Sequence, residues 1–171
     1  MNIWVSSLAR VHEIAASARP ERIVSLLAKE DAFPALSGYG ADRHHKVRVD
    51  DIRAEIAGYV APSGEHVRGL IDFVKAWRRD EPLLVHCWAG ISRSTATAFI
   101  AACLHNPEAD EASIALALRA ASPTAFPNTR IVALADDILR RRGRMAAAVE
   151  AIGRGDIAEE AEPFFIPGRF E

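Results

Sequence analysis

Two cysteines, Cys87 and Cys103, are the strongest candidate nucleophiles in this sequence, and their surroundings differ sharply. Cys87 follows an apolar run at residues 83–86 and opens a short loop that contains Gly90 and ends at Arg93. A strand, a tight loop and a helix in this order direct backbone N–H groups inward, and the helix N-terminus adds partial positive charge. This arrangement is suited to binding a tetrahedral anion.

Arg93 and Ser94 suit an attack by Cys87 on such an anion. The planar guanidinium of Arg93 can bind two phosphoryl oxygens at once. Its charge and the helix N-terminus favour the thiolate of Cys87, which is the attacking form. Gly90 can adopt the positive φ that a tight loop requires. Ser94 can donate a hydrogen bond to the sulfur when it leaves. These residues predict displacement at phosphorus through a phosphocysteine.

The segment from Val85 to Ser94 resembles the active-site signature of the protein tyrosine phosphatases, most of all the dual-specificity-like branch. The shared pattern is His-Cys after a strand, five residues with a central glycine, then arginine and a hydroxyl residue. By order of elements the resemblance covers about residues 45–140. It implies an enzyme of bacterial type that needs no metal or other cofactor. The implied phosphate-binding residues are Trp88, Ala89, Gly90, Ile91, Ser92 and Arg93.

The same family uses an aspartic acid as general acid, on a loop before the cysteine. Asp50 and Asp51 are the two candidates here, and Asp51 stands 36 positions before Cys87. Val47 and Val49 alternate as in the family's strand, and this register favours Asp51. The acid would protonate the leaving oxygen and later activate water. We expect Asp50 instead to cap a loop or helix.

Four further residues receive supporting or structural roles. In related phosphatases an asparagine braces the backbone of the phosphate loop, and Asn128 can do so while capping a helix. His86 is expected to tune the thiolate by hydrogen bonding. Cys103, in an apolar helical run, is expected to be an inert core thiol rather than a redox partner of Cys87. Trp88 either lines the rim or packs inward.

Short apolar runs alternate with amphipathic patterns and predict the elements that hold this loop. Strands are expected at residues 3–5, 22–28, 46–49 and 83–86. Helices are expected at residues 7–18, 62–79, 92–105, 106–121, 128–142 and 144–152. The predicted fold is α/β, with a small, mostly parallel central sheet flanked by helices and a helical C-terminal half.

The length of 171 residues suits one phosphatase domain. We expect residues 153–171 to be a docked tail, because Phe164 and Phe165 are too apolar to remain free. The arginines at positions 140, 141, 142 and 144 are expected to form a solvated helix end. Two cysteines do not form a disulfide framework, and the first residues lack a signal-peptide pattern. A cytoplasmic location is therefore predicted.

The formal net charge of −2 gives no broad electrostatic footprint for nucleic acid or an anionic membrane. No apolar run is long enough to span a bilayer. The expected partner is a phosphorylated protein or a small phosphomonoester, bound by a monomer or a weak homodimer. The favoured substrate is phosphotyrosine. The depth of the pocket, which we expect the loop at residues 29–45 to influence, decides whether phosphoserine and phosphothreonine are also accepted.

Four alternatives share part of this pattern. Phosphoinositide phosphatases tend to carry lysines inside the loop, whereas the loop interior from Trp88 to Ser92 is uncharged and favours singly phosphorylated substrates. Rhodanese-type sulfurtransferases usually have a shorter loop without the His-Cys and Arg-Ser framing. Low-molecular-weight phosphatases and arsenate reductases carry their cysteine near the N-terminus. A silent phosphate-binding module would lack the nucleophile, the arginine or the acid, and all three are present here.

Overall fold

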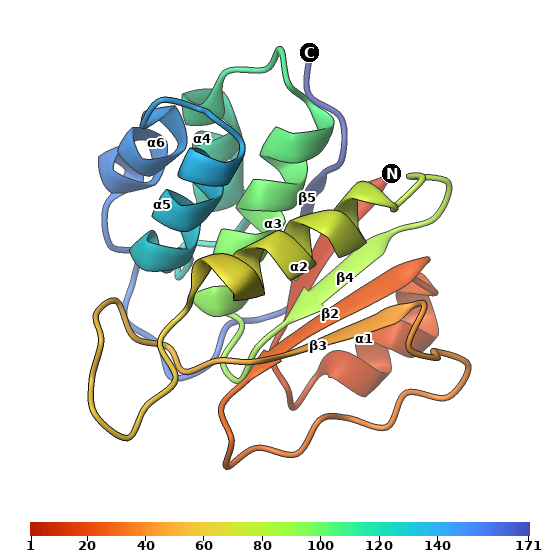
Figure 1. Ribbon diagram of the computed structural model, residues 1–171. Helices are drawn as coiled ribbons and strands as arrows, with labels where there is room; N and C mark the ends of the chain where they lie inside the picture. The colour runs from red at the N-terminus through yellow and green to blue at the C-terminus, as the bar shows by residue number, and fades with distance from the viewer.

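The computed structural model describes all 171 residues and has a five-stranded sheet between two layers of helices (Figure 1). The strand order is β3-β2-β4-β1-β5. Strands β3, β2, β4 and β1 run parallel to one another, and β5 pairs antiparallel with β1 at the edge. The strands are β1 (Asn2–Ser6), β2 (Arg22–Leu27), β3 (His44–Arg48), β4 (Leu83–His86) and β5 (Phe164–Pro167). The predicted α/β fold with a mostly parallel sheet is confirmed.

One helix covers one face of the sheet, and five helices lie on the other (Figure 1). Helix α1 (Val11–Ala18) packs against the first face. The second face carries α2 (Gly64–Lys75), α3 (Arg93–His105), α4 (Glu111–Ala121), α5 (Thr129–Ile138) and α6 (Arg144–Ile152). Nearly every residue of α3 is buried, because it lies between the sheet and the other helices. This explains its almost uniformly apolar sequence.

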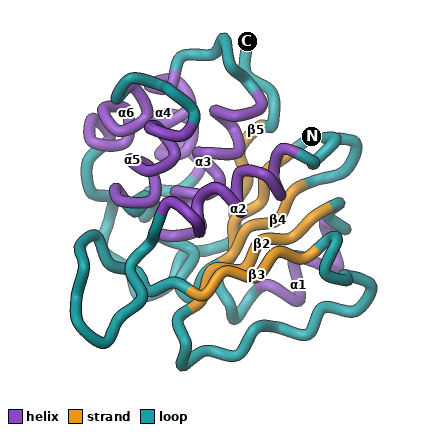
Figure 2. The backbone as a smooth tube through the Cα atoms, in the orientation of Figure 1, coloured by secondary structure: helices purple, strands orange, loops and turns teal.

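The core follows the alternation of side chains along the strands. Val24 and Val85 face α3, whereas Ile23 and Leu84 face α1. All four residues of β4 are buried, as expected for a central parallel strand covered on both faces. Two long loops leave the carboxyl ends of β2 and β3 (Figure 2). The second of these carries Asp50 and Asp51 at its start and lies beside the end of β4.

Several helix boundaries differ from the prediction: α1 begins at Val11 and not at residue 7, α2 spans Gly64–Lys75 and not residues 62–79, and two further differences have a clear local cause. The helix expected from Asn106 begins at Glu111, because Asp110 is its cap and accepts a hydrogen bond from the N–H of Ser113 at 3.0 Å. Asn106 instead donates to the carbonyls of Ala102 and Gly168. The helix expected to reach residue 142 ends at Ile138, since the backbone reverses at residues 140 and 142, both of positive φ.

The prediction that the arginine cluster is solvated is wrong for Arg141. This residue is only 8% exposed. It pairs with Glu111 at 3.1 Å and donates to the carbonyl of Cys103 at 2.7 Å. Arg144 binds the other carboxylate oxygen of Glu111. The cluster therefore joins α3, α4 and α6, which explains why charged residues occur where helices pack together.

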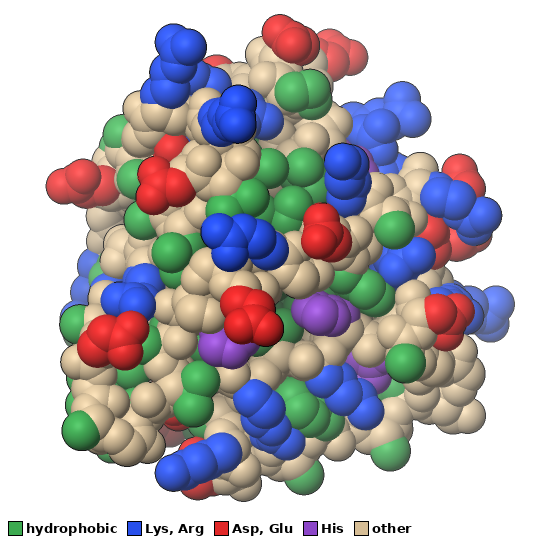
Figure 3. Space-filling model, in the orientation of Figure 1, with side chains coloured by type: hydrophobic (Ala, Val, Ile, Leu, Met, Phe, Trp, Pro, Cys, Tyr) green, Lys and Arg blue, Asp and Glu red, His purple; other side chains and the backbone are tan.

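The C-terminal segment returns to the sheet. Strand β5 adds to the edge of β1, with Phe164 buried and the ring of Phe165 4.9 Å from that of Trp4. The N–H of Gly168 donates to the carbonyl of Met1, so the segment that follows β5 lies beside the first residue. Acidic and basic side chains are interspersed over the face that carries α2 (Figure 3). No helix is both long and apolar enough to cross a bilayer.

Candidate active site

The candidate site lies where β4 ends and α3 begins, at the carboxyl edge of the sheet. Cys87 directly follows β4, and Arg93 is the first residue of α3. The residues between them, here called the phosphate loop (residues 88–92), turn back over the end of the sheet. Most of the loop lines a cavity of about 350 Å³ together with Cys87, Arg93 and Asp51.

Hydrogen bonds from outside hold the carbonyl groups of the phosphate loop away from this cavity. A trans peptide places its C=O and its N–H on opposite sides. Carbonyls fixed outward therefore turn the N–H groups of the loop toward the cavity and form an anion nest. The donors are the N–H groups of Leu8 to Trp88 (3.0 Å), Ala161 to Ala89 (2.9 Å), Phe126 to Ile91 (2.9 Å) and Asn128 to Ser92 (3.2 Å).

Two groups lie within hydrogen-bond distance of the sulfur of Cys87. The N–H of Gly90 donates to Sγ at 3.3 Å, and the hydroxyl oxygen of Ser94 lies 3.1 Å from Sγ. Gly90 has φ of 74°, and a Cβ there would come within 3.0 Å of the backbone of Ser6 and Ser7. Both the conformation and the space therefore require glycine at this position.

Arg93 is fixed at one nitrogen and free at another. Its Nη1 donates to the carbonyl of Val49 at 2.9 Å, and the residue is 6% exposed. Its Nε is buried but bonds no other atom of the protein. Because Arg93 lines the cavity, this nitrogen can donate to an oxygen of a bound phosphoryl group.

The two aspartates of the loop after β3 have different environments. Oδ1 of Asp51 accepts hydrogen bonds from the Ser92 hydroxyl at 2.7 Å and from the Asn128 amide at 2.8 Å, and Asp51 lines the cavity. Asp50 is buried, and its Oδ2 accepts the N–H of Val60 at 2.6 Å. Asp51 thus lies where an acid could reach a substrate, whereas Asp50 closes the loop at residues 50–60.

Asn128 braces the site differently from the prediction. Its side-chain N–H groups donate to Asp51 and to the carbonyl of Ile52, so the side chain holds the acid loop. The bond to the phosphate loop comes instead from its backbone N–H, which donates to Ser92. Its Oδ1 caps α5 by accepting the N–H of Ile131 at 3.1 Å. Only the capping role matches the prediction for this side chain.

His86 belongs to a buried chain of hydrogen bonds across three strands. Its Nδ1 lies 3.2 Å from the carbonyl of Cys87, which can only accept, so Nδ1 carries the proton. Its Nε2 then accepts from the hydroxyl of Ser25 at 2.5 Å, and Ser25 accepts from Nε2 of His44 at 2.7 Å. Burial lowers the pKa of both histidines to about 4. Both rings are therefore neutral at pH 7.

Comparison with known proteins agrees with this geometry. Residues 58–124 match the family described as Protein-tyrosine phosphatase. The matched segment includes Cys87, the phosphate loop and Arg93. Its fold is similar to that of DUSP15, with a TM-score of 0.59, 19% identity and coverage of 91% of this chain and 92% of that chain. Human DUSP28 gives a TM-score of 0.61 at 20% identity, over 82% and 94% of the two chains.

The family match therefore supports the predicted resemblance to protein tyrosine phosphatases, and the fold is similar to those of DUSP15 and human DUSP28. A structure described as PTPMT1 in complex with PI(5)P also matches in fold, with a TM-score of 0.52, 9% identity and coverage of 86% and 90% of the two chains. No curated protein sequence matches the chain.

The rim of the cavity comes mostly from residues that the sequence pattern did not indicate. Trp88 is 53% exposed and lines the cavity, so it lies at the rim and does not pack inward. The loop at residues 29–45 does not line the cavity, contrary to expectation. The remaining rim residues are Arg53, Phe126, Arg154, Ala158 and Glu159. The last three lie in the C-terminal tail, and no local motif connects that tail to Cys87.

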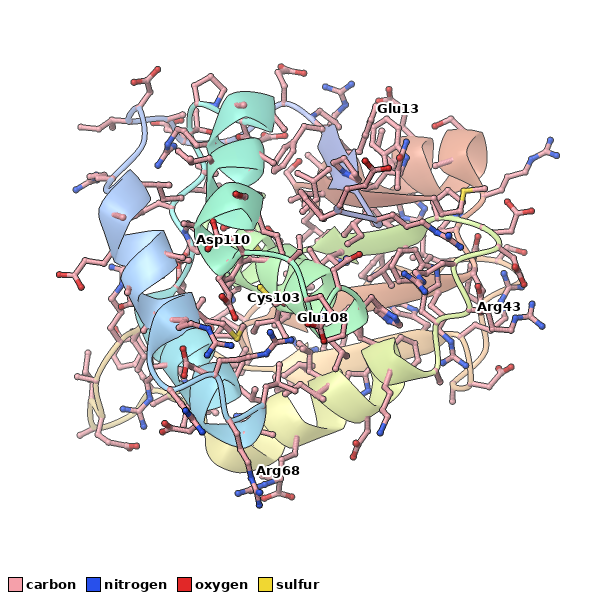
Figure 4. The ribbon with its side chains drawn as sticks, turned by 90° about the horizontal axis from the view of Figure 1, so that it is seen from above. Glu13, Arg43, Arg68, Cys103, Glu108 and Asp110 are labelled. Carbon is pink, nitrogen blue, oxygen red and sulfur yellow. The ribbon has the colours of Figure 1, made fainter.

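The second cysteine lies away from the cavity. Cys103 is fully buried in α3, where Figure 4 shows it among the helices. Burial raises the pKa of its thiol to about 12, so it stays protonated at neutral pH. This agrees with an inert core thiol. No group of three His, Cys, Asp or Glu side chains lies close enough together to hold a metal ion.

Proposed function

We propose that this protein hydrolyses phosphomonoesters through a phosphocysteine formed on Cys87, and that its substrate is phosphotyrosine in proteins. One observation carries the proposal. Cys87, Arg93 and Asp51 line one cavity, and hydrogen bonds from outside hold the carbonyl groups of the phosphate loop between Cys87 and Arg93. Nucleophile, anion site and acid are the three parts that this reaction needs.

In the first step the Cys87 thiolate attacks phosphorus. The S–P bond forms as the bond from phosphorus to the tyrosine oxygen breaks, and protonated Asp51 gives its proton to that oxygen. The loop N–H groups and Arg93 bind the phosphoryl oxygens, where negative charge is concentrated in the transition state. His86 supports the loop through the carbonyl of Cys87 and does not contact substrate.

In the second step water displaces the sulfur. Asp51, now a carboxylate, accepts a proton from the attacking water. The S–P bond breaks, and the hydroxyl of Ser94 stabilises the leaving thiolate, which it already contacts at 3.1 Å. The products are inorganic phosphate and the original thiolate. Neither step needs a metal or another cofactor, because Arg93 and the loop N–H groups supply the positive potential.

Two aromatic rings at the rim favour phosphotyrosine. Trp88 and Phe126 line the cavity, and flat apolar side chains of this kind can pack on the phenyl ring of the substrate. The fold shared with DUSP15 and human DUSP28 supports acceptance of phosphoserine and phosphothreonine as well. We take the chain as one phosphatase domain that acts as a monomer or weak homodimer.

The proposal is tested by hydrolysis of an aryl phosphate in the presence of EDTA. The wild-type protein should turn over, and the Cys87→Ser variant should not. Full turnover by the serine variant, or a strict requirement for added metal, would contradict the thiolate mechanism. A sulfurtransferase would instead move sulfur from thiosulfate to cyanide, which this protein should fail to do.

A further inference from the structure

Two arginines stand at the mouth of the cavity without a carboxylate partner. Arg53, two positions after Asp51, and Arg154, in the tail, both line the cavity. Their guanidinium carbons lie 4.4 Å and 5.6 Å from the centre of the Phe126 ring. Neither takes part in a salt bridge or a side-chain hydrogen bond, whereas the nearby Arg130 is paired with a glutamate. Their donors are therefore available to a ligand.

The phosphoryl group of a substrate does not account for this pair. Arg93 and the inward N–H groups already surround the position that one phosphoryl group would take. Two guanidinium groups beside one ring repel each other, and the ring offsets this only in part. A second anion at the rim would relieve the repulsion and use the free donors of both arginines.

The charges around this pair favour a peptide over a membrane as the source of that anion. Glu159 lines the same cavity, and Asp156 and Glu160 stand exposed on the same stretch of tail. An anionic bilayer would bring many negative charges against these carboxylates and be repelled. A peptide can instead bring one acidic group to the arginines while its other side chains avoid the acidic segment.

We propose that Arg53 and Arg154 form a subsite for a second anionic group beside the phosphotyrosine of a protein substrate. That group is the carboxylate of an aspartate or glutamate, or the phosphate of a second phosphorylated residue. The inference rests on the proposed phosphatase function of Cys87. The uncharged phosphate loop predicted singly phosphorylated substrates. That prediction concerns the loop alone, and the two arginines at the rim allow a substrate with a second anionic group.

The test compares two phosphotyrosine peptides that differ only in having glutamate or glutamine at the flanking positions. In the wild-type protein, kcat/KM should be about tenfold higher for the glutamate peptide, equivalent to about 1.4 kcal/mol. The ratio should fall to near one in the double variant Arg53→Gln, Arg154→Gln. The matched control is Arg68→Gln, an exposed arginine that projects from α2 and does not line the cavity (Figure 4). It should keep the wild-type ratio.

Each other outcome counts against a distinct claim. A ratio near one in the wild-type protein, or an unchanged ratio in the double variant, overturns the subsite while leaving the phosphatase function intact. Much faster turnover of phosphatidylinositol phosphate in vesicles, lost in the double variant, would assign the arginines to a lipid headgroup and contradict the peptide source. If the wild-type protein hydrolyses neither peptides, vesicles nor aryl phosphates, the proposed function itself fails.

Discussion

Asp50 and Asp51 are neighbours in the chain but differ in what their carboxyl groups contact. Asp51 lies in the cavity with Ser92 and Asn128 on one oxygen. Asp50 is turned inward onto the N–H of Val60. The chain leaves β3 at Arg48 and bends at Asp51, and the two carboxyl groups take different directions. One residue is thereby available for proton transfer and the other for closing the loop.

Replacement of Asp51 by Asn should lower kcat by about 10²–10⁴, the range that general acid catalysis contributes. The loss should be smaller for p-nitrophenyl phosphate than for phenyl phosphate, because nitrophenolate leaves without a proton. Asp50→Asn should instead lower the free energy of unfolding by about 1–3 kcal/mol. For both variants, steady-state kinetics measures kcat and urea unfolding measures the free energy of unfolding. An equal loss of kcat in the Asp50 variant would show that the assignment of the two aspartates is wrong.

The buried histidines predict how stability depends on pH. In the folded protein the pKa of His44 and of His86 is about 4, below the ordinary value of 6.5. Between these values the unfolded chain binds more protons than the folded chain, so the free energy of unfolding falls as pH decreases from 6.5 to 4. Above pH 6.5 both histidines are neutral in the folded and the unfolded chain, so their full contribution to stability is present.

Urea unfolding at pH 7 and pH 5 tests this dependence. His44→Gln should reduce the difference between the two pH values, because one group that resists protonation is gone. A wild-type protein as stable at pH 5 as at pH 7 would count against two neutral buried histidines.

At the scale of the elements, three separate segments hold the phosphate loop in shape. The β1–α1 connection, the stretch before α5 and the C-terminal tail each donate to one or more of its carbonyls. The first of these also packs against Gly90 so closely that a Cβ has no room. The loop is therefore fixed by its surroundings as well as by its own sequence.

Gly90→Ala should lower kcat at least tenfold, because the loop must move to relieve the contact with Ser6 and Ser7. The matched control is Gly143→Ala. Gly143 has a similar φ of 82°, but nothing lies within 4 Å of a Cβ placed there. Both variants should lose about 1 kcal/mol of stability through backbone strain. If Gly143→Ala lowers kcat as much as Gly90→Ala does, the steric account of the loop is wrong.

The elements that sequence predicted are those with strong local signals. Strand β4, the phosphate loop and the cap of α5 at Asn128 follow from apolar runs, glycine position and capping chemistry over a few residues. Strand β5 was missed, because its place depends on the free edge of β1 at the opposite end of the chain. The rim residues Phe126 and Arg154 were missed for the same reason. Contacts between residues far apart in the sequence bring Phe126 and Arg154 to Cys87, and no short sequence pattern predicts such contacts.

At the scale of the whole molecule, segments from the N-terminal and the C-terminal parts of the chain both reach the site. The N-terminal strand leads into Leu8, and the tail passes Ala161 before it pairs with β1, so each contributes one hydrogen bond to the phosphate loop. The helical half is joined by a buried ion pair between Glu111 and Arg141, with side chains 5% and 10% exposed. The sheet positions the chemistry, and the helices stabilise the sheet.

Removing the charge of Glu111 should destabilise the whole molecule. Glu111→Gln leaves Arg141 buried without its counter-ion, which costs about 3–5 kcal/mol. Glu13→Gln breaks an exposed pair with Arg10 and should cost much less, because solvent screens that pair. Chemical denaturation of the two variants compares these values. Similar losses for both would mean that the buried pair adds nothing beyond an ordinary surface contact.

The covalent intermediate tests the central claim most directly. The wild-type protein is mixed with an aryl phosphate, quenched in acid within the first turnover and analysed by peptide mass spectrometry. A phosphoryl group should be found on Cys87, and more of it should accumulate in Ser94→Ala, in which the thiolate leaves less readily. Sustained turnover with no phosphoryl group on Cys87 in either protein, or with the group on another residue, would contradict the account.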